Sequence, residues 1–351
     1  PICLNYVYGT VKPAAVQEPD DNTVPGAQRS IGPSPSHGAA HGSGGCTSVQ
    51  CFGTSMINWQ PKLGACARRM LVGVIDTAPD PDHPAFRDKR INFGYFRPSG
   101  VPKAPARELH GTGVLSLLVG SPHSSTPGLI PDADIYVADA FYSDANGQTV
   151  SDTQTLVAAL EWMEAVGVQV INLSLSGPQD PIVYSVIRRL AQKRVIMVAA
   201  AGNEGPHAAP SYPAAYKEVV AVTAVDRERN HYRNANQGSY IDLAAPGVKV
   251  WTAVAGHRAG GLQTGTSFAT PYVTAVAASL YRHLPVKSKA GFLRHVAAVD
   301  LGPPGPDPIY GRGLIQAPAG CAPNIGPRIP TPPVARGATP GVVSASITRA
   351  Q

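Results

Sequence analysis

Short apolar runs alternate with amphipathic stretches through the middle of the chain. The clearest run, residues 70–75, stops at Asp76, as expected for a buried strand of a parallel sheet. Strands that alternate with helices predict an α/β fold of three layers, with a mainly parallel central sheet and helices on both faces. Further apolar runs that predict strands span residues 133–141, 168–173, 195–200 and 219–225.

Helices are predicted between these runs from their apolar stripes. One begins at a capping box, Ser151–Gln154, and two more follow His110 and Ser267, ending near residues 120 and 283. The fourth spans about residues 181–193. The positions predicted to face the core are Leu156, Leu160 and Met163 in the helix after Ser151, and Val183, Val186, Ile187 and Leu190 in the fourth helix.

The two ends of the chain have a different composition. Residues 1–50 are rich in Pro, Gly, Ser, Ala and His and lack helical or strand periodicity, so they are predicted to form an extension or linker. Residues 319–351 are rich in proline and lack acidic side chains, which favours a mobile tail. Residues 51–318 are therefore predicted to form the folded domain.

Composition limits the class of protein. With 351 residues, 43% of them hydrophobic, the chain can bury a large core, and no apolar run approaches the roughly 18 residues that a membrane span needs. The formal net charge is +6, but no run of five or six like charges exists. A mildly basic protein is therefore expected rather than a nucleic-acid-binding one.

All five cysteines lie outside the segments that carry the candidate chemistry. Such peripheral cysteines favour disulfides and an oxidising compartment, so a secreted or periplasmic location is expected. Cys51 and Cys66 flank a 14-residue loop and are the preferred pair. A zinc site formed by His37, His41, Cys46 and Cys51 is a weaker alternative, because the spacing matches no standard zinc motif. The cysteines are Cys3, Cys46, Cys51, Cys66 and Cys321.

Three residues at predicted strand or helix ends could form one catalytic centre. Asp76 ends a strand, His110 opens a helix, and Ser267 lies at the start of an Ala- and Val-rich helix. Taken singly, each has a common structural role as a turn former or helix cap. Together they supply a nucleophile, a base and a carboxylate that orients the base.

The motifs around these residues resemble those of the subtilisin-like serine peptidases, and the order Asp, His, Ser is that of subtilisin. The resemblance covers about residues 66–318 and implies a subtilisin-like fold and a serine endopeptidase that works through an acyl-enzyme. It rests on Val74–Thr77, His110–Gly113, Ile171–Leu175, Ala200–Gly205, Ala245–Gly247 and Gly265–Pro271, with Tyr310–Ile315 as a C-terminal signature.

The chemistry agrees with the roles that the resemblance implies. Ser267 needs a base to become a nucleophile, and His110 can serve because imidazole titrates near neutral pH. Asp76 would fix the tautomer of His110. Backbone N–H groups at the start of the Ser267 helix, with the side-chain amide of Asn203, would bind the oxyanion.

Substrate contacts also follow from the resemblance. Ser174, Leu175 and Ser176 would form an extended edge that pairs with the peptide backbone. Glu204 and Ser211 would lie at the rim of the pocket for the residue before the scissile bond, where a basic or polar side chain could be favoured; a solvated loop position for Glu204 is the alternative. Ala200, Ala201 and Gly202 would form the opposite wall of that pocket.

The sequence departs from the family pattern at several places. Ala78 and Gly113 replace a common Gly and His, and Ser176 replaces a Gly on the substrate edge. The loop at residues 121–129 lacks the Asn-rich insertion that binds calcium in many relatives, so no calcium site, other metal site or organic cofactor is predicted. The family also implies a cis peptide bond before Pro213.

Polypeptide substrates are the expected partners, together with an N-terminal pro-domain or a protein inhibitor. Residues 1–50 look too short and too rich in glycine to be that pro-domain. Two alternative functions remain open. A transamidase or macrocyclase would keep the same three residues, whereas a catalytically silent peptide-binding protein would be expected to lose one.

Overall fold

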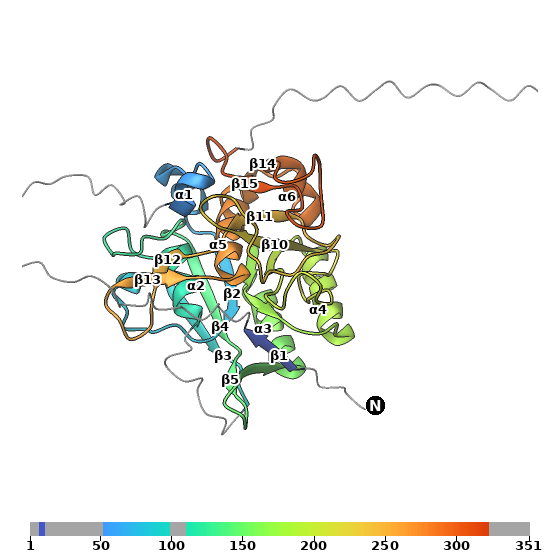
Figure 1. The fold of residues 1–351 in the computed structure, drawn as a ribbon. Coiled ribbons are helices and arrows are strands. Elements are labelled where there is room, and N and C mark those ends of the chain that lie inside the picture. Colours follow the sequence, from blue (N-terminus) through green and yellow to red (C-terminus); the bar gives the residue numbers. More distant parts are fainter. Residues whose placement is uncertain (1–6, 11–51, 99–109, 323–351) are drawn as a thin grey trace, which may run out of the picture.

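The computed structural model describes residues 7–10, 52–98 and 110–322, and it describes residues 7–10 by their backbone. A nine-stranded sheet forms the centre of this part of the chain, in the order β14-β15-β11-β10-β9-β7-β2-β4-β3 (Figure 1). The strands are β2 (Leu71–Asp76), β3 (Ile91–Tyr95), β4 (Asp134–Asp139), β7 (Val170–Leu173), β9 (Ile196–Ala200), β10 (Val219–Val225), β11 (Leu243–Pro246), β14 (Ala297–Val299) and β15 (Leu314–Gln316).

All neighbouring strands from β3 to β15 pair in parallel, and β14 alone runs antiparallel, at one edge. Each predicted apolar run forms one of these strands, and β2, β7, β9 and β10 are buried almost throughout. The mainly parallel sheet that the sequence predicts is therefore confirmed.

Helices cover both faces of the sheet, as predicted. One hydrophobic core lies between the sheet and helices α2 (His110–Val119) and α5 (Thr266–Leu280), and a second lies between the sheet and helices α3 (Thr153–Val166) and α4 (Pro181–Gln192). Successive residues of a strand pack into opposite cores, because side chains alternate between the two faces of a sheet. The remaining helices are α1 (Phe52–Met56), α6 (Lys289–His295), η1 (Pro61–Ala67), η2 (Pro84–Phe86) and η4 (Tyr281–His283).

Helix α3 begins one residue later than its capping box predicts. Asp152, not Ser151, is the N-cap, and its carboxylate accepts a hydrogen bond of 2.8 Å from the backbone N–H of Thr155. Ser151 instead belongs to a strand, β6 (Thr149–Asp152), so its backbone is extended up to the cap. The predicted core positions of this helix are nevertheless buried.

A second sheet has the order β5-β6-β1-β8 and contains a strand that the sequence does not predict. Residues 7–10 form β1 (Val7–Thr10), which pairs antiparallel with β6 on one side and with β8 (Leu175–Ser176) on the other. Figure 1 draws β1 in dark blue above the label of β5 (Tyr142–Ser143), which pairs with the other side of β6. Pairing with two neighbours creates this strand, so the local periodicity of residues 1–50 does not reveal it. A separate hairpin joins β12 (Val250–Ala253) to β13 (Gly260–Gln263).

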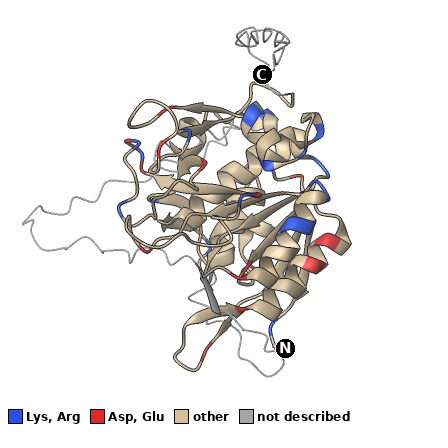
Figure 2. Cartoon of the chain, turned by 90° about the vertical axis from the view of Figure 1, so that its right-hand side faces the viewer, with Lys and Arg blue, Asp and Glu red and all other residues tan. Residues whose placement is uncertain are grey.

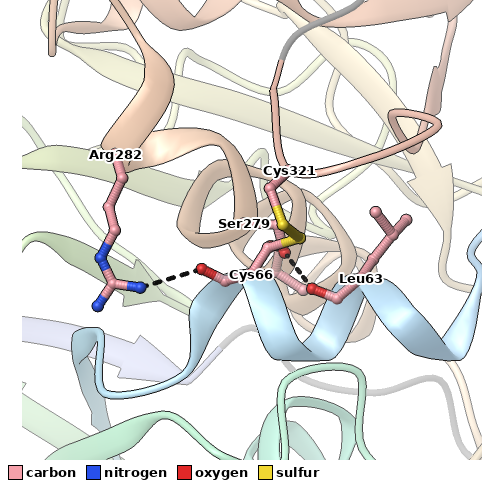
Figure 3. Close-up of a disulfide and its surroundings, with 6 residues drawn as sticks. Leu63, Cys66, Ser279, Arg282 and Cys321 are labelled. Atoms are coloured by element: carbon pink, nitrogen blue, oxygen red, sulfur yellow. Dashed lines mark hydrogen bonds between the residues drawn. A yellow bond between two sulfur atoms is a disulfide. The ribbon is translucent and has the colours of Figure 1, made fainter.

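The preferred cysteine pair is wrong. Cys66 forms a disulfide with Cys321, with their Cα atoms 5.2 Å apart, and Cys51 lies outside the described residues (Figure 3). Cys66 lies in η1, whose Leu63 carbonyl accepts a hydrogen bond from Ser279 of α5. The Cys66–Cys321 disulfide therefore links the segment that follows β15 to η1, which lies 255 residues earlier in the sequence. The zinc alternative and most of the predicted tail also fall outside the described residues.

Within the described ranges, no helix is long and apolar enough to cross a membrane. Lysines and arginines are distributed over separate elements rather than gathered on one helix (Figure 2).

Candidate active site

The candidate residues meet at the carboxyl ends of the central strands, where ligand sites of parallel sheets lie. Asp76 is the last residue of β2, Ser174 follows β7, and Asn203 follows β9. His110 is the first residue of α2, and Ser267 lies in the first turn of α5. Segments almost 200 residues apart in sequence are thus brought to one edge of the sheet.

Asp76 and His110 are in direct contact. The Nδ1 atom of His110 lies 2.9 Å and 3.0 Å from the two carboxylate oxygens of Asp76, and both side chains are almost fully buried. Thr77 supports the pair, because its backbone N–H donates to Asp76 and its hydroxyl accepts from the backbone N–H of Gly111. Since a carboxylate accepts only, Nδ1 carries the proton and Nε2 of the neutral ring is an acceptor.

The His110 ring also packs beside the serine-bearing helix. Its centroid is 5.3 Å from that of Phe268, the residue after Ser267, and Nε2 is buried without a hydrogen-bond partner among the described residues. A buried acceptor without a partner is costly and calls for an explanation. Transient acceptance of a proton from a neighbouring hydroxyl would supply one.

Ser267 is held by reciprocal contacts with the loop after β7. Its buried hydroxyl lies 3.4 Å from the carbonyl oxygen of Ser174, while the Ser174 hydroxyl donates to the carbonyl of Ser267 at 3.0 Å. Behind Ser174, Asn172 donates to the Ser174 hydroxyl and accepts from Thr274. This chain of hydrogen bonds fixes α5 to the sheet at the position of Ser267. Asn172 belongs to the motif Ile171–Leu175, but the sequence assigns this role neither to it nor to Thr274.

The orientation of the Asn203 side chain follows from its neighbours. The backbone N–H of Thr266 donates to Oδ1 of Asn203 at 3.1 Å, and the Thr266 hydroxyl lies 3.0 Å from the same oxygen. Because a backbone N–H can only donate, the atom that faces it must be the amide oxygen. The amide nitrogen is therefore presented on the other side, near the Cα of Gly265. The sequence motif identifies Asn203 but not the orienting role of Thr266.

The predicted pocket wall and rim lie together. Ala200, Ala201 and Gly202 are buried, and the Tyr240 hydroxyl donates to the Ala201 carbonyl. Burial raises the pKa of Tyr240 to about 12, so the phenol stays protonated and keeps that bond. The Glu204 carboxylate accepts a hydrogen bond of 3.3 Å from Ser176. Its other oxygen lies next to Gly202, on the side where a Cβ atom would point.

Leu175, in the predicted substrate edge, also lines a small apolar hollow of about 10 Å³. The hollow is bounded by the first turns of α3 and α4, through Leu156 and Val183, and by Pro213. The peptide bond before Pro213 is cis, which confirms that prediction.

A second buried carboxylate at this edge was not identified from the sequence. Asp139 ends β4, forms an ion pair of 2.8 Å with Arg97, and accepts a hydrogen bond from the backbone of Ala78. It therefore holds the loop that follows Asp76. The available signal was an acidic residue inside the apolar run at residues 133–141.

Within the described residues, no group of three or more His, Cys, Asp or Glu side chains is arranged to hold a metal ion. The Asp80 carboxylate accepts hydrogen bonds from the backbone N–H groups of Asp82 and Gly256, so it serves the loop structure.

The fold and this group of side chains define the chain as a protein with a three-layer α/β fold and the side-chain set of a serine hydrolase. Residues 67–313 match the model of the Subtilase family (Peptidase_S8). The chain belongs to the subtilase family, whose subtilisin relatives are serine endopeptidases.

Individual relatives agree with this assignment. The chain is 32% identical to Subtilisin BL of Lederbergia lenta over 71% of its own length and 89% of that protein. It is 30% identical to the Minor extracellular protease Epr of Bacillus subtilis over 73% of its length, but spans only 39% of Epr. Among solved structures, a mutant of the protease domain of PatA superposes with a TM-score of 0.60 at 26% identity, covering 70% of this chain and 92% of that one.

Proposed function

We propose that this subtilase is an endopeptidase that cleaves peptide bonds through an acyl-enzyme on Ser267. The observation that carries the proposal is the buried Asp76–His110 pair. Its Nε2 atom has no hydrogen-bond partner in the described part of the chain and belongs to a ring packed against the residue after Ser267. A base in this state can accept the hydroxyl proton when substrate closes the site, since catalytic hydrogen bonds are often long without ligand.

In the proposed reaction, Ser267 Oγ attacks the scissile carbonyl carbon and its proton moves to His110 Nε2. Asp76 stabilises the imidazolium that forms. The oxyanion accepts hydrogen bonds from the Asn203 amide and from backbone N–H groups at the start of α5. His110 then gives the proton to the leaving amine, and water, deprotonated by His110, releases the acyl group and restores Ser267.

The substrate would bind as an extended strand along Ser174–Ser176. The residue before the scissile bond would enter the pocket bounded by Ala200–Gly202, with the Glu204 carboxylate at its rim. A carboxylate that is exposed and held at this rim favours a basic or polar side chain there. The extracellular protease among the relatives and the disulfide both support an exported enzyme.

The test combines labelling with hydrolysis. A serine-directed fluorophosphonate should label Ser267 in the full chain and fail to label Ser267→Ala, as read by peptide mass spectrometry. Asn203→Ala should still be labelled, more slowly, and should lose a factor of about 10²–10³ in kcat on casein, a magnitude taken from the equivalent change in subtilisin.

Asn234→Ala, in the loop between β10 and β11, is the matched control and should retain activity. Labelling at another residue, or equal kcat for Asn203→Ala and the parent chain, would contradict the proposed roles.

A further inference from the structure

Three charged side chains lie in a row across the carboxyl ends of neighbouring strands, and the row begins at Asp76. Asp76 ends β2, and its register partner in β4 is Asp139, which ends that strand. Arg97 follows β3, the strand on the other side of β4, and forms an ion pair with Asp139. We call these three residues the charge row.

Both carboxylates of the charge row lie on one face of the sheet. Val74 and Val137, two residues before Asp76 and Asp139, belong to the core that α2 and α5 cover. Alternate residues of a strand share a face, so the carboxylates lie on the side of α2. Two negative charges on adjacent strands repel each other, and Arg97 compensates the second one at 2.8 Å. The Arg97 and Asp139 side chains are only 12% and 4% exposed, so water and salt screen them little.

Hydrogen bonds connect Asp139 to Asp76 through the loop that follows β2. Asp139 accepts a bond of 3.2 Å from the backbone N–H of Ala78. The preceding residue, Thr77, donates its own N–H to Asp76 and accepts from the N–H of Gly111, the second residue of α2. A displaced Asp139 would therefore disturb both Asp76 and the start of α2.

We propose that Arg97 is a positioning residue for the reaction, which acts through Asp139 on the placement of Asp76 and on the charge around His110. The inference rests on the proposed function, because it takes His110 as the base. With Arg97 in place, the outer two members of the charge row cancel. The His110 ring then faces the single negative charge of Asp76.

Few other charges lie near His110 in the described part of the chain. The elements that pack most closely against α2 are α5, β12, η2 and β2, and Asp76 is the only carboxylate, imidazole or cationic side chain in them. Burial raises the pKa of Tyr272 in α5, so that phenol stays neutral. Glu204 lies across the site, at the pocket rim. The loop between β2 and η2 adds Asp80, Asp82 and His83.

Removal of either outer charge should move the pH at which His110 gains a proton. Arg97→Gln leaves Asp139 uncompensated, and the added negative charge favours the imidazolium. Asp139→Asn leaves Arg97 uncompensated, and the added positive charge disfavours the imidazolium. Coulomb's law with the high effective permittivity of a hydrated site predicts shifts of about 0.3–0.5 pH unit in opposite directions.

The experiment measures the rate at which a fluorophosphonate labels Ser267 as a function of pH. Labelling needs the unprotonated base, so the rate rises with pH along a limb whose midpoint reports His110. This midpoint should lie higher in Arg97→Gln, lower in Asp139→Asn and near that of the parent in the double variant. A midpoint does not depend on the amount of active enzyme, so partial misfolding of a variant does not mimic the result.

The plateau rate above the limb tests the positioning role. It should fall several-fold in Arg97→Gln, because Asp139 is no longer held toward Ala78. Arg97→Lys keeps the charge, so it should keep the midpoint of the parent and recover most of the plateau rate. A plateau in Arg97→Gln equal to that of the parent would contradict the positioning role.

Arg90 and Asp134 provide the matched control. They form an ion pair across the same two strands, β3 and β4, but at the opposite ends of these strands. Arg90→Gln and Asp134→Asn should therefore leave both the midpoint and the plateau unchanged. The inference requires midpoint shifts of opposite sign in Arg97→Gln and Asp139→Asn. Any other pair of results overturns it, as does a similar shift in the control variants.

An NMR titration of the His110 ring separates this inference from the proposed function. The chains also carry Ser267→Ala, so no reaction occurs, and the signal is assigned by its absence from His110→Gln. The midpoints should shift as they do in the labelling. Such shifts without labelling of Ser267 in the parent would uphold the role of the charge row and refute the peptidase proposal. Labelling of the parent with unchanged midpoints would refute the inference alone.

Discussion

At the scale of single residues, the candidate site depends on groups that fix one another. Asp76 orients His110, Thr266 orients Asn203, and Ser174 holds the backbone of Ser267. The motifs predict the orienting role of Asp76, but they do not predict the supports that Thr266 and Ser174 provide. Each support is a hydrogen bond between segments that meet only in the folded chain.

Phe268 gives a prediction about oxidation. It follows Ser267, is 2% exposed and packs against the His110 ring. Methionine becomes a polar sulfoxide on oxidation, and phenylalanine cannot react in this way. Millimolar peroxide should therefore leave the kcat of the parent chain largely intact and should lower that of Phe268→Met several-fold.

Casein hydrolysis before and after peroxide treatment provides the measurement. Met70, Met163 and Met197 are fully buried, so they serve as internal references that mass spectrometry should find unoxidised. Rapid loss of activity in the parent chain, with Ser267 still reactive toward fluorophosphonate, would refute the prediction.

At the scale of elements, one buried N-cap residue links two neighbouring helices, α3 and α4. Asp180 is the N-cap of α4, accepts hydrogen bonds from the backbone N–H groups of Ile182 and Val183, and also accepts from the Thr153 hydroxyl in α3 at 2.7 Å. One carboxylate thus fixes the starts of two adjacent helices. The contact helps to position β6, which runs directly into α3.

Asp180→Ala should lower the free energy of unfolding by about 2–4 kcal/mol, because it leaves several buried donors without an acceptor. Asp180→Asn keeps an oxygen toward the α4 N-terminus and should lose clearly less. Thr153→Val removes the hydroxyl that donates to Asp180, at nearly constant volume, and should lose about 1 kcal/mol. Urea unfolding gives the three values, and equal losses for Ala and Asn would show that the cap is not responsible.

At the scale of the whole molecule, the Cys66–Cys321 disulfide closes most of the folded chain. The two residues are 255 positions apart, and Figure 3 shows the bond beside the contact between Leu63 and Ser279. Arg282 of η4, which directly follows α5, donates to the carbonyl oxygen of Cys66. The C-terminal strands and η1 are therefore held as one unit.

Loss of this disulfide should destabilise the protein by about 2–5 kcal/mol, because an open chain of this length regains conformational entropy when it unfolds. Cys66→Ser, Cys321→Ser and the double variant should lower the free energy of unfolding by similar amounts, since each breaks the same bond. Chemical unfolding with and without a reducing agent tests this. A loss in the double variant equal to the sum of two large single losses would exclude a shared bond.

The sequence by itself determined the succession of buried strands and amphipathic helices, and with it the parallel sheet, because burial imposes a period that can be read locally. Its motifs also identified Asp76, His110, Ser267 and Asn203 as the candidate chemistry. Even the start of α3 was predicted to within one residue, since caps act over three or four positions.

Only the tertiary structure decided which distant partners meet. No periodic pattern in the sequence marks three of these contacts. They are the pairing of Cys66 with Cys321, the insertion of β1 between β6 and β8, and the hydrogen bond from Ala78 to Asp139. Each depends on the closure of a long loop, whose geometry is fixed by the packing of the whole domain. Neighbouring residues do not encode that geometry, so it becomes visible only in the folded molecule.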